Sequence, residues 1–110
     1  MSVIDGTDKD LRSLLYQKHC VAVKYHSSSC ERCKAFRPIF DALSRKSKYA
    51  DILFVRMNAD ENPVAKKFIN DRDMPFMGIY NNGLLLESTT VGSEEAITVL
   101  LDKLLAHQQG

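Results

Sequence analysis

Apolar residues recur along this chain in two patterns, continuous runs and a spacing of three or four residues, and the two patterns alternate. The pattern predicts strands at residues 3–4, 20–25, 51–57, 76–80 and 84–90. The runs at 20–25 and 51–57 are nearly continuous, which is typical of strands buried on both faces. Asn81-Asn82-Gly83 lies between the last two strands and predicts a hairpin.

The segments between these strands have helical spacing. Helices are expected after the cap residue Thr7, over residues 34–49, from Pro63 through residue 68 with Asn62 as cap, and after Ser93. Pro38 lies inside the second helix and should kink it or free one backbone carbonyl. The order β-α-β-α-β-α-β-β-α predicts an α/β fold, a central mixed sheet flanked by helices that ends in an antiparallel hairpin.

The size and composition of the chain limit the classes of protein to which it can belong. A chain of 110 residues has room for one domain, which we place at residues 1–110. The net charge of +1 gives no electrostatic reason to expect a nucleic acid or an anionic membrane as partner. Three cysteines are too few, and odd in number, for a disulfide-stapled secreted scaffold. No signal peptide or membrane-spanning run is visible, so we expect a cytoplasmic protein, or an organellar one if a presequence was removed.

The chemistry of the chain points to Cys30-Glu31-Arg32-Cys33, which lies between a predicted strand and a predicted helix. A thiol at the start of a helix faces unpaired backbone N–H groups and the positive end of the helix dipole. Both favour the thiolate, which is the reactive species. The second cysteine follows one helical turn later, close enough to form a disulfide with the first. This spacing in a chain of mixed strands and helices indicates a dithiol–disulfide redox site.

With these motifs, nearly the whole chain resembles a thioredoxin. The matching pieces are the strand that leads into Cys30-Glu31-Arg32-Cys33-Lys34, and then Pro38, Arg56-Met57-Asn58-Ala59-Asp60, Met74-Pro75, Asn82-Gly83 and Val91-Gly92. The resemblance implies the thioredoxin fold and a thiol–disulfide oxidoreductase. It implies Cys30 as the exposed nucleophile and Cys33 as the buried resolving thiol. Pro75 matches the family's cis-proline, and Met74, Val91 and Gly92 match its substrate groove, in which the Met74 backbone would be free to pair with an extended substrate.

The chain departs from the family pattern beneath and beside the cysteines. It has no tryptophan, and Tyr25-His26 stands where the family usually has an aromatic pair ending in tryptophan. Lys24 replaces the buried carboxylate that usually serves the resolving thiol, and Arg56 stands where a lysine often pairs with that carboxylate. Lys24 could be neutral and act as a base, charged and stabilise the thiolates, or extended to solvent with no chemical role.

Charges around the motif are expected to tune the pKa of the thiols. Arg32 should stabilise the Cys30 thiolate, Glu31 should oppose it, and His26 is expected to be a polar neighbour that stabilises the thiolate. A charged Lys24 and an altered motif predict a redox potential less reducing than that of a standard thioredoxin, in the range of roughly −230 to −180 mV.

The expected partners are protein disulfides, with a reductase or a small thiol such as glutathione as electron donor, and the protein is expected to be a monomer without a bound cofactor or metal. Two alternatives stay open. The first is a redox-inactive, thioredoxin-like protein-binding module. The second is a zinc or iron–sulfur site built on His26, Cys30 and Cys33, which lacks a visible fourth ligand. Cys20, inside a strand, is expected to be an inert buried thiol.

Overall fold

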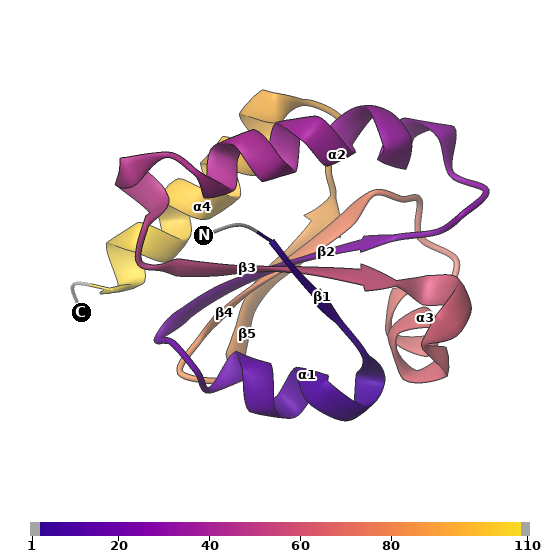
Figure 1. Cartoon of the computed structure of the whole chain (residues 1–110), viewed down its shortest axis with the longest axis horizontal. Coiled ribbons are helices and arrows are strands. Elements are labelled where there is room, and N and C mark those ends of the chain that lie inside the picture. The colour runs from indigo at the N-terminus through magenta and orange to yellow at the C-terminus, as the bar shows by residue number, and fades with distance from the viewer. Residues whose placement is uncertain (1–2, 109–110) are drawn as a thin grey trace.

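The strands form one sheet in the order β1-β3-β2-β4-β5 (Figure 1). The computed structural model describes residues 3–108. The strands are β1 (Ile4–Gly6), β2 (Cys20–His26), β3 (Ile52–Asn58), β4 (Phe76–Asn81) and β5 (Leu84–Thr90). β1, β3 and β2 are parallel, whereas β4 and β5 are antiparallel to their neighbours. The parallel pairs follow from crossover helices and the antiparallel edge from a hairpin.

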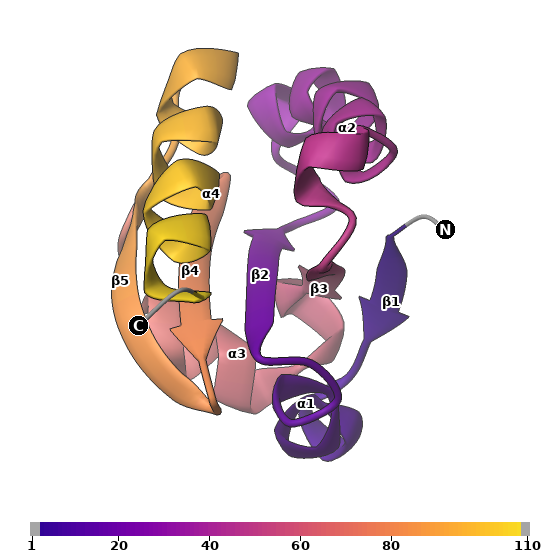
Figure 2. The same cartoon turned by 90° about the vertical axis from the view of Figure 1, so that its left-hand side faces the viewer.

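Two helices cover each face of this sheet (Figures 1 and 2). They are α1 (Asp8–Leu15), α2 (Glu31–Ser44), α3 (Pro63–Ile69) and α4 (Glu94–Gln108), with 3₁₀ turns at η1 (Ser47–Tyr49) and η2 (Ala59–Glu61). α2 and α4 lie on one face, and α1 and α3 on the other. The predicted fold class, a mixed sheet flanked by helices, is therefore confirmed. The outer ends of the domain expected at 1–110 lie outside the described residues.

Alternation along β2 divides the interior into two apolar clusters. Val21, Val23 and Tyr25 pack on the side of α1 and α3, whereas Cys20 and Ala22 pack on the side of α2 and α4. Because successive side chains of a strand point to opposite faces, Lys24 belongs to the α2 side. Cross-strand register places Arg56 of β3 and Met77 of β4 beside it. The strand register therefore brings two cationic residues together beneath α2.

The second helix begins earlier than its apolar pattern predicted. It starts at Glu31 instead of near residue 34, and it ends at Ser44, so that residues 47–49 form the separate turn η1. Its N-cap is Cys30, whose sulfur accepts a hydrogen bond from the backbone N–H of Cys33. The first turn of α2 is polar and exposed apart from Cys33, so apolar periodicity reveals only the later turns.

Asp8 supplies the cap that we expected from Asn62. Asn62 occupies the N-cap position of α3, but its side chain makes no capping hydrogen bond there. The Asp8 carboxylate instead accepts from the backbone N–H groups of Val64 and Ala65, and Asn62 Oδ1 accepts from the backbone N–H of Asp8. The prediction of Asn62 at the N-cap position is confirmed, whereas the side chain that caps the helix, Asp8, lies more than fifty residues away in the sequence.

The predicted hairpin between β4 and β5 is confirmed, and its turn has two residues because β4 extends through Asn81. Asn82 and Gly83 both have positive φ values, 52° and 81°, which is the conformation that favours Asn-Gly in a tight hairpin. Just before it, Tyr80 is buried, and its hydroxyl forms a hydrogen bond of 3.0 Å with the Tyr25 hydroxyl. Tyr80 is thus a core residue.

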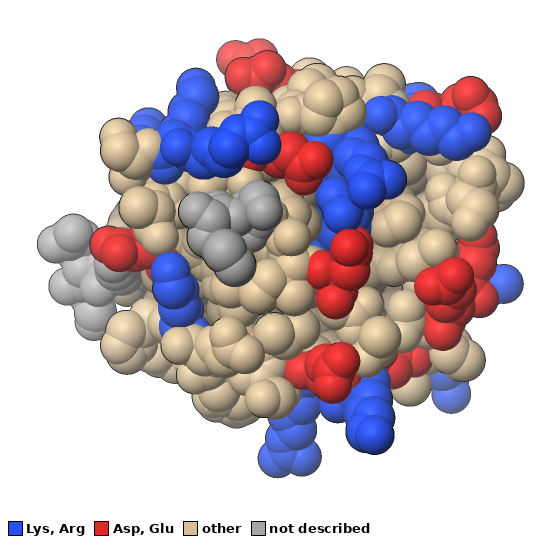
Figure 3. Space-filling model, viewed as in Figure 1, with Lys and Arg blue, Asp and Glu red and all other residues tan. Residues whose placement is uncertain are grey.

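The molecular surface is mixed in charge on the face seen in Figure 3, where basic and acidic side chains are interspersed. This distribution agrees with the nearly balanced composition of the chain. Within the described residues, no helix has both the length and the apolar character needed to cross a membrane.

Candidate active site

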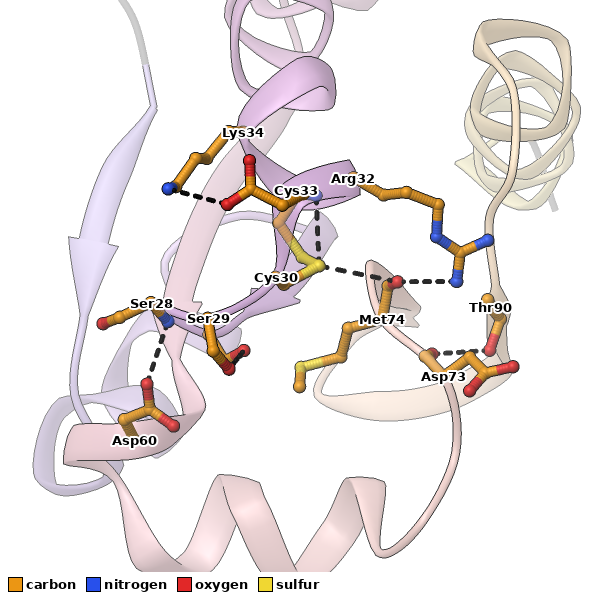
Figure 4. Close-up of a disulfide and its surroundings, with 12 residues drawn as sticks. Ser28, Ser29, Cys30, Arg32, Cys33, Lys34, Asp60, Asp73, Met74 and Thr90 are labelled. Carbon is orange, nitrogen blue, oxygen red and sulfur yellow. Dashed lines mark hydrogen bonds and ion pairs between the residues drawn. A yellow bond between two sulfur atoms is a disulfide. The ribbon is translucent and has the colours of Figure 1, made fainter.

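Cys30 and Cys33 are joined by a disulfide at the N-terminal end of α2 (Figure 4). Their Cα atoms are 5.3 Å apart, within the usual range for bridged cysteines. The Cys30 sulfur accepts the Cys33 backbone N–H at 3.1 Å, so one of the unpaired donors of the helix end is directed at it. The arrangement confirms the predicted pairing and the predicted place at a helix start.

The two sulfurs differ in access. Cys33 is 4% exposed, whereas Cys30 is only partly buried. The loop before Cys30 is fixed by backbone contacts: the Cys30 N–H donates to Ser27 O, and the Ser28 N–H donates to the Asp60 carboxylate at 2.9 Å. A visiting thiolate or disulfide therefore reaches Cys30 before Cys33, which is the order expected of a nucleophile and a resolving thiol.

Of the four residues predicted to form the groove, Met74 contacts Cys30, and the four differ in what they expose. The Met74–Pro75 peptide bond is cis, as the resemblance implied. The Val91 N–H donates to Pro75 O at 2.9 Å, which ties the two segments together. The Val91 side chain is completely buried in the core, so this residue offers its backbone and not a side-chain wall. A Cβ on the exposed Gly92 would meet no atom within 4 Å, so space for an approaching chain is present there.

The Arg32 side chain contacts the Met74 backbone, which we expected to be free for pairing with a substrate. Its guanidinium donates to the Met74 carbonyl oxygen at 3.0 Å, and Cys30 Sγ lies 3.6 Å from the same oxygen (Figure 4). The expectation of a free Met74 backbone was therefore wrong for its carbonyl group. Arg32 also places a cation close to Cys30, whereas the opposing carboxylate of Glu31 pairs with Lys34 at 3.1 Å.

Lys24 is buried beneath the disulfide. It is 1% exposed, and its ammonium lies 5.1 Å from the centroid of the Phe40 ring, a cation–π contact. The interpretation of Lys24 as a side chain extended to solvent is therefore wrong. Burial, and then the positive charge of Arg56, lower the pKa of Lys24 from 10.5 to about 8. At pH 7 Lys24 is therefore mostly charged, which favours the second of the three roles considered for it.

Arg56 is compensated, in contrast to Lys24. Its guanidinium donates to Asp5 on β1 at 2.9 Å and to Asp41 on α2 at 3.3 Å. Sequence reasoning missed both partners and also Arg37, which lines a cavity with Lys24 and Cys33. The sequence did contain a signal for Arg37 and Asp41, because they follow Cys33 at intervals of four residues and therefore share its face of α2. Asp5 depends on the register between β1 and β3, which no local pattern gives.

His26 lies at the end of β2 and lines the same cavity as Cys33. Burial, and then the charges of Lys24 and Arg56, lower its pKa, so the ring is neutral at pH 7 and adds no positive charge near the thiols. In the described part of the chain, no three His, Cys, Asp or Glu side chains gather in a way suited to a metal ion. Cys20 is a free, buried thiol, and the Asn81 side-chain amide donates to its sulfur at 3.8 Å.

Comparisons with known proteins agree with this geometry. Residues 2–104 match the family model described as Thioredoxin. Thioredoxin 1 of Plasmodium falciparum is 24% identical over 106 residues, which cover 96% of this chain and all of the relative. The thioredoxin of Buchnera aphidicola is 28% identical over 93 residues, which cover 83% of each chain.

Solved structures show the same fold. A Plasmodium falciparum thioredoxin structure superposes with a TM-score of 0.81 at 21% identity, covering 94% of this chain and 98% of that one. The reduced Schistosoma mansoni thioredoxin pre-protein superposes with a TM-score of 0.83 at 26% identity, covering 94% and 99% of the two chains.

We predict that Lys24→Met stabilises the oxidised protein at pH 7, by about 1–4 kcal/mol, because it removes a buried charge that no carboxylate pairs. Above a pH of about 8 the folded protein loses this charge while the unfolded chain keeps it until about 10.5, so wild-type stability rises across that window. The gain from Lys24→Met should therefore shrink between pH 8 and pH 10.5. Urea unfolding of both proteins at pH 7, 9 and 10.5 measures it.

Lys67→Met on the exposed face of α3 serves as the matched control, and it should change stability by less than about 0.5 kcal/mol at any pH. A loss of stability in Lys24→Met at pH 7 would show instead that the Lys24 charge is favourably compensated.

Proposed function

Because this chain belongs to the thioredoxin family of thiol–disulfide oxidoreductases, we propose that it exchanges protein disulfides through Cys30 and Cys33. The observation that carries the proposal is the pair itself: two cysteines at disulfide distance on a helix N-terminus, one accessible and one buried. The Cys33 N–H directed at the Cys30 sulfur favours its thiolate in the reduced protein.

The proposed reaction has two exchange steps. The Cys30 thiolate attacks one sulfur of a substrate disulfide, which forms a mixed disulfide and releases the first substrate thiolate. Cys33 loses its proton and attacks Cys30 Sγ, which releases the second substrate thiolate and leaves the Cys30–Cys33 disulfide. Two electrons have then moved from the protein to the substrate. An external dithiol reductase, or a small thiol such as glutathione, returns them.

Substrate recognition would use the backbone beside Cys30. An extended chain that pairs with the Met74 carbonyl must replace the hydrogen bond that Arg32 donates there. Arg32 is exposed, so this exchange requires only a change of side-chain rotamer. Gly92 leaves open space on the opposite side, next to the Val91–Pro75 contact. We propose that Met74, Pro75, Val91 and Gly92 form the groove and that Arg32 closes it in the resting oxidised state.

The cellular setting is also a proposal. A free buried thiol in Cys20 and a single exchangeable disulfide suit a reducing compartment such as the cytoplasm. We propose a monomer that acts on protein disulfides. We propose neither a nucleic acid nor a membrane as partner, because the net charge is close to zero.

We propose further that the protein is less reducing than a standard thioredoxin. Reduction creates thiolate at a site where the neutral disulfide had no charge, so a nearby cation stabilises the reduced form. Lys24 is mostly charged at neutral pH, and Arg32 lies against the same carbonyl as Cys30. Both raise the reduction potential, and we place it between roughly −230 and −180 mV.

Turnover tests the oxidoreductase proposal against the binding-module alternative. In a dithiothreitol-coupled insulin reduction assay, the wild type should be active and Cys30→Ser should fall to background, because the attacking thiolate is gone. Cys20→Ala, which removes a thiol remote from the helix end, should keep wild-type turnover. Background rates for both the wild type and Cys30→Ser would favour a redox-inactive binding module.

Equilibration of the dithiol against glutathione at pH 7 tests the proposed potential. The wild type should fall in the stated range, and Lys24→Met should be more negative by about 30 mV for each tenfold loss in thiolate stabilisation. This difference should close at alkaline pH, where Lys24 loses its charge. A wild-type value near −270 mV, about that of thioredoxin, would contradict the proposal.

The pH dependence of Cys30 alkylation tests the role of Arg32. We expect an apparent pKa for Cys30 well below ~8.5 in the reduced wild type. Arg32→Gln should raise it by roughly 0.2–0.7 unit, the equivalent of 0.3–1 kcal/mol for a charge at a helix terminus. Lys34→Gln is the matched control, since Glu31 already pairs the Lys34 charge. Equal shifts of the Cys30 pKa in both variants would show that Arg32 does not specifically stabilise the Cys30 thiolate.

A further inference from the structure

A cavity of about 330 Å³ lies beneath the disulfide, between α2 and the sheet. Its lining includes Lys24, His26, Cys33, Arg37, Arg56 and Asn58. The volume is at the lower end of the range for small-molecule sites and corresponds to several water molecules at ~30 Å³ each. The cavity therefore has room for a small ion and its remaining hydration, and the buried sulfur of the redox pair forms part of its wall.

Two cations in this cavity have no partner among the described residues. Lys24 is 1% exposed, and among the described residues its ammonium has no hydrogen-bond or ion-pair partner and contacts the Phe40 ring. Arg37 makes no ion pair or hydrogen bond within the described part of the chain. A largely desolvated ammonium without an anionic partner among these residues is costly, and a bound anion would remove much of this cost.

The acidic groups nearby are already engaged. Asp5 and Asp41 both pair with Arg56, and Glu31 pairs with Lys34. In Figure 3, basic side chains lie over the gap between α2 and β1, with acidic side chains against them. An adjoining hollow, which shares Arg37 and Arg56 with the cavity, has Asp5 and Glu61 in its wall.

The local field is positive in spite of these carboxylates. Burial lowers the pKa of His26 most, and the charges of Lys24, Arg56 and Arg37 lower it further. Asp5 acts in the opposite direction and has the smallest effect. Arg56 and Arg37 also lower the pKa of Lys24, against the influence of Asp41. Burial is the largest cause of both shifts, and the contributions from neighbouring charges indicate a site that favours an added negative charge.

We propose that this cavity is an anion site that binds a small oxyanion of the phosphate, sulfate or carboxylate type between Lys24 and Arg37, and that its occupancy depends on the redox state of Cys33. Binding itself is independent of the proposed function, whereas the redox dependence rests on it. Reduction by a dithiol adds two electrons and a proton to the disulfide and gives one thiol and one thiolate. Negative charge on the reduced pair repels an anion beside Cys33, so the oxidised protein binds it more tightly.

Reciprocity then fixes the effect of the anion on the redox pair. An anion that prefers the oxidised protein tenfold must lower the reduction potential by about 30 mV at saturation. A small anion in the cell would thus make this protein more reducing by occupying the space where the family usually places a carboxylate side chain.

Titration of the oxidised protein with inorganic phosphate tests the site directly. Calorimetry at pH 7 and constant ionic strength should show saturable binding at one site. Lys24→Met should weaken it at least tenfold, because it removes the buried cation while keeping an apolar chain of similar length. Arg37→Gln, an exposed change that the fold tolerates, should weaken it several-fold, and Lys67→Gln on the opposite face should leave it unchanged.

Separate arms with sulfate and with acetate identify the class of anion, since each should compete with phosphate if the site accepts oxyanions in general. Binding that does not saturate, or that is equal in the wild type, Lys24→Met and Arg37→Gln, would overturn the site. The reduction potential is then measured in phosphate and in chloride at equal ionic strength. Saturable binding without a shift in potential would overturn the redox coupling.

The two proposals fail in different experiments. Insulin turnover is measured without phosphate, so an inactive wild type would contradict the proposed function and leave the phosphate titration unaffected. A missing phosphate response with normal turnover would contradict the anion site alone.

Discussion

A lysine buried beneath the helix end that carries the disulfide is the constraint on which the rest of the site depends. Lys24 is 1% exposed and lies in β2, the strand between the two apolar clusters. Its ammonium ends at a cavity beside Cys33. Because the charge stays in place at neutral pH, the neighbours must adapt to it, and His26 does so by remaining neutral.

Strand register decides which cation is compensated. Asp5, Arg56 and Lys24 lie at one level across β1, β3 and β2. Arg56, in the middle, pairs with Asp5 from one side and with Asp41 of α2 from above. Both local carboxylates are thereby drawn to Arg56, whose planar guanidinium can hold two of them, whereas an ammonium is a point charge. Lys24 is left with an aromatic ring and the cavity.

Local patterns in the sequence predicted the fold and the cysteine pair, because each depends on residues close in the chain. The Asn82-Gly83 turn and the helix start at the Cys-x-x-Cys motif are of this kind. Contacts between distant segments were not predictable. The Asp8 cap of α3, the Asp5–Arg56 pair and the Arg32–Met74 contact each join segments more than forty residues apart. The burial of Lys24 likewise follows from how strands pair, and periodicity within one strand does not contain that information.

The burial of a charged side chain at Lys24 has opposite consequences in the two redox states. In the oxidised protein the buried charge has no ionic partner within residues 3–108, so it lowers the stability of the fold. In the reduced protein the same charge faces a thiolate, so part of its cost is recovered as electrostatic attraction. The Lys24 charge therefore destabilises the oxidised protein relative to the reduced protein, which raises the reduction potential. In most sequences the residue type at each position suits its place in the fold, and exceptions occur at functional sites. A charged lysine at a buried strand position is such an exception. A carboxylate at this position would repel the thiolate and lower the reduction potential, so the charge of the residue beneath Cys33 sets the direction of that shift.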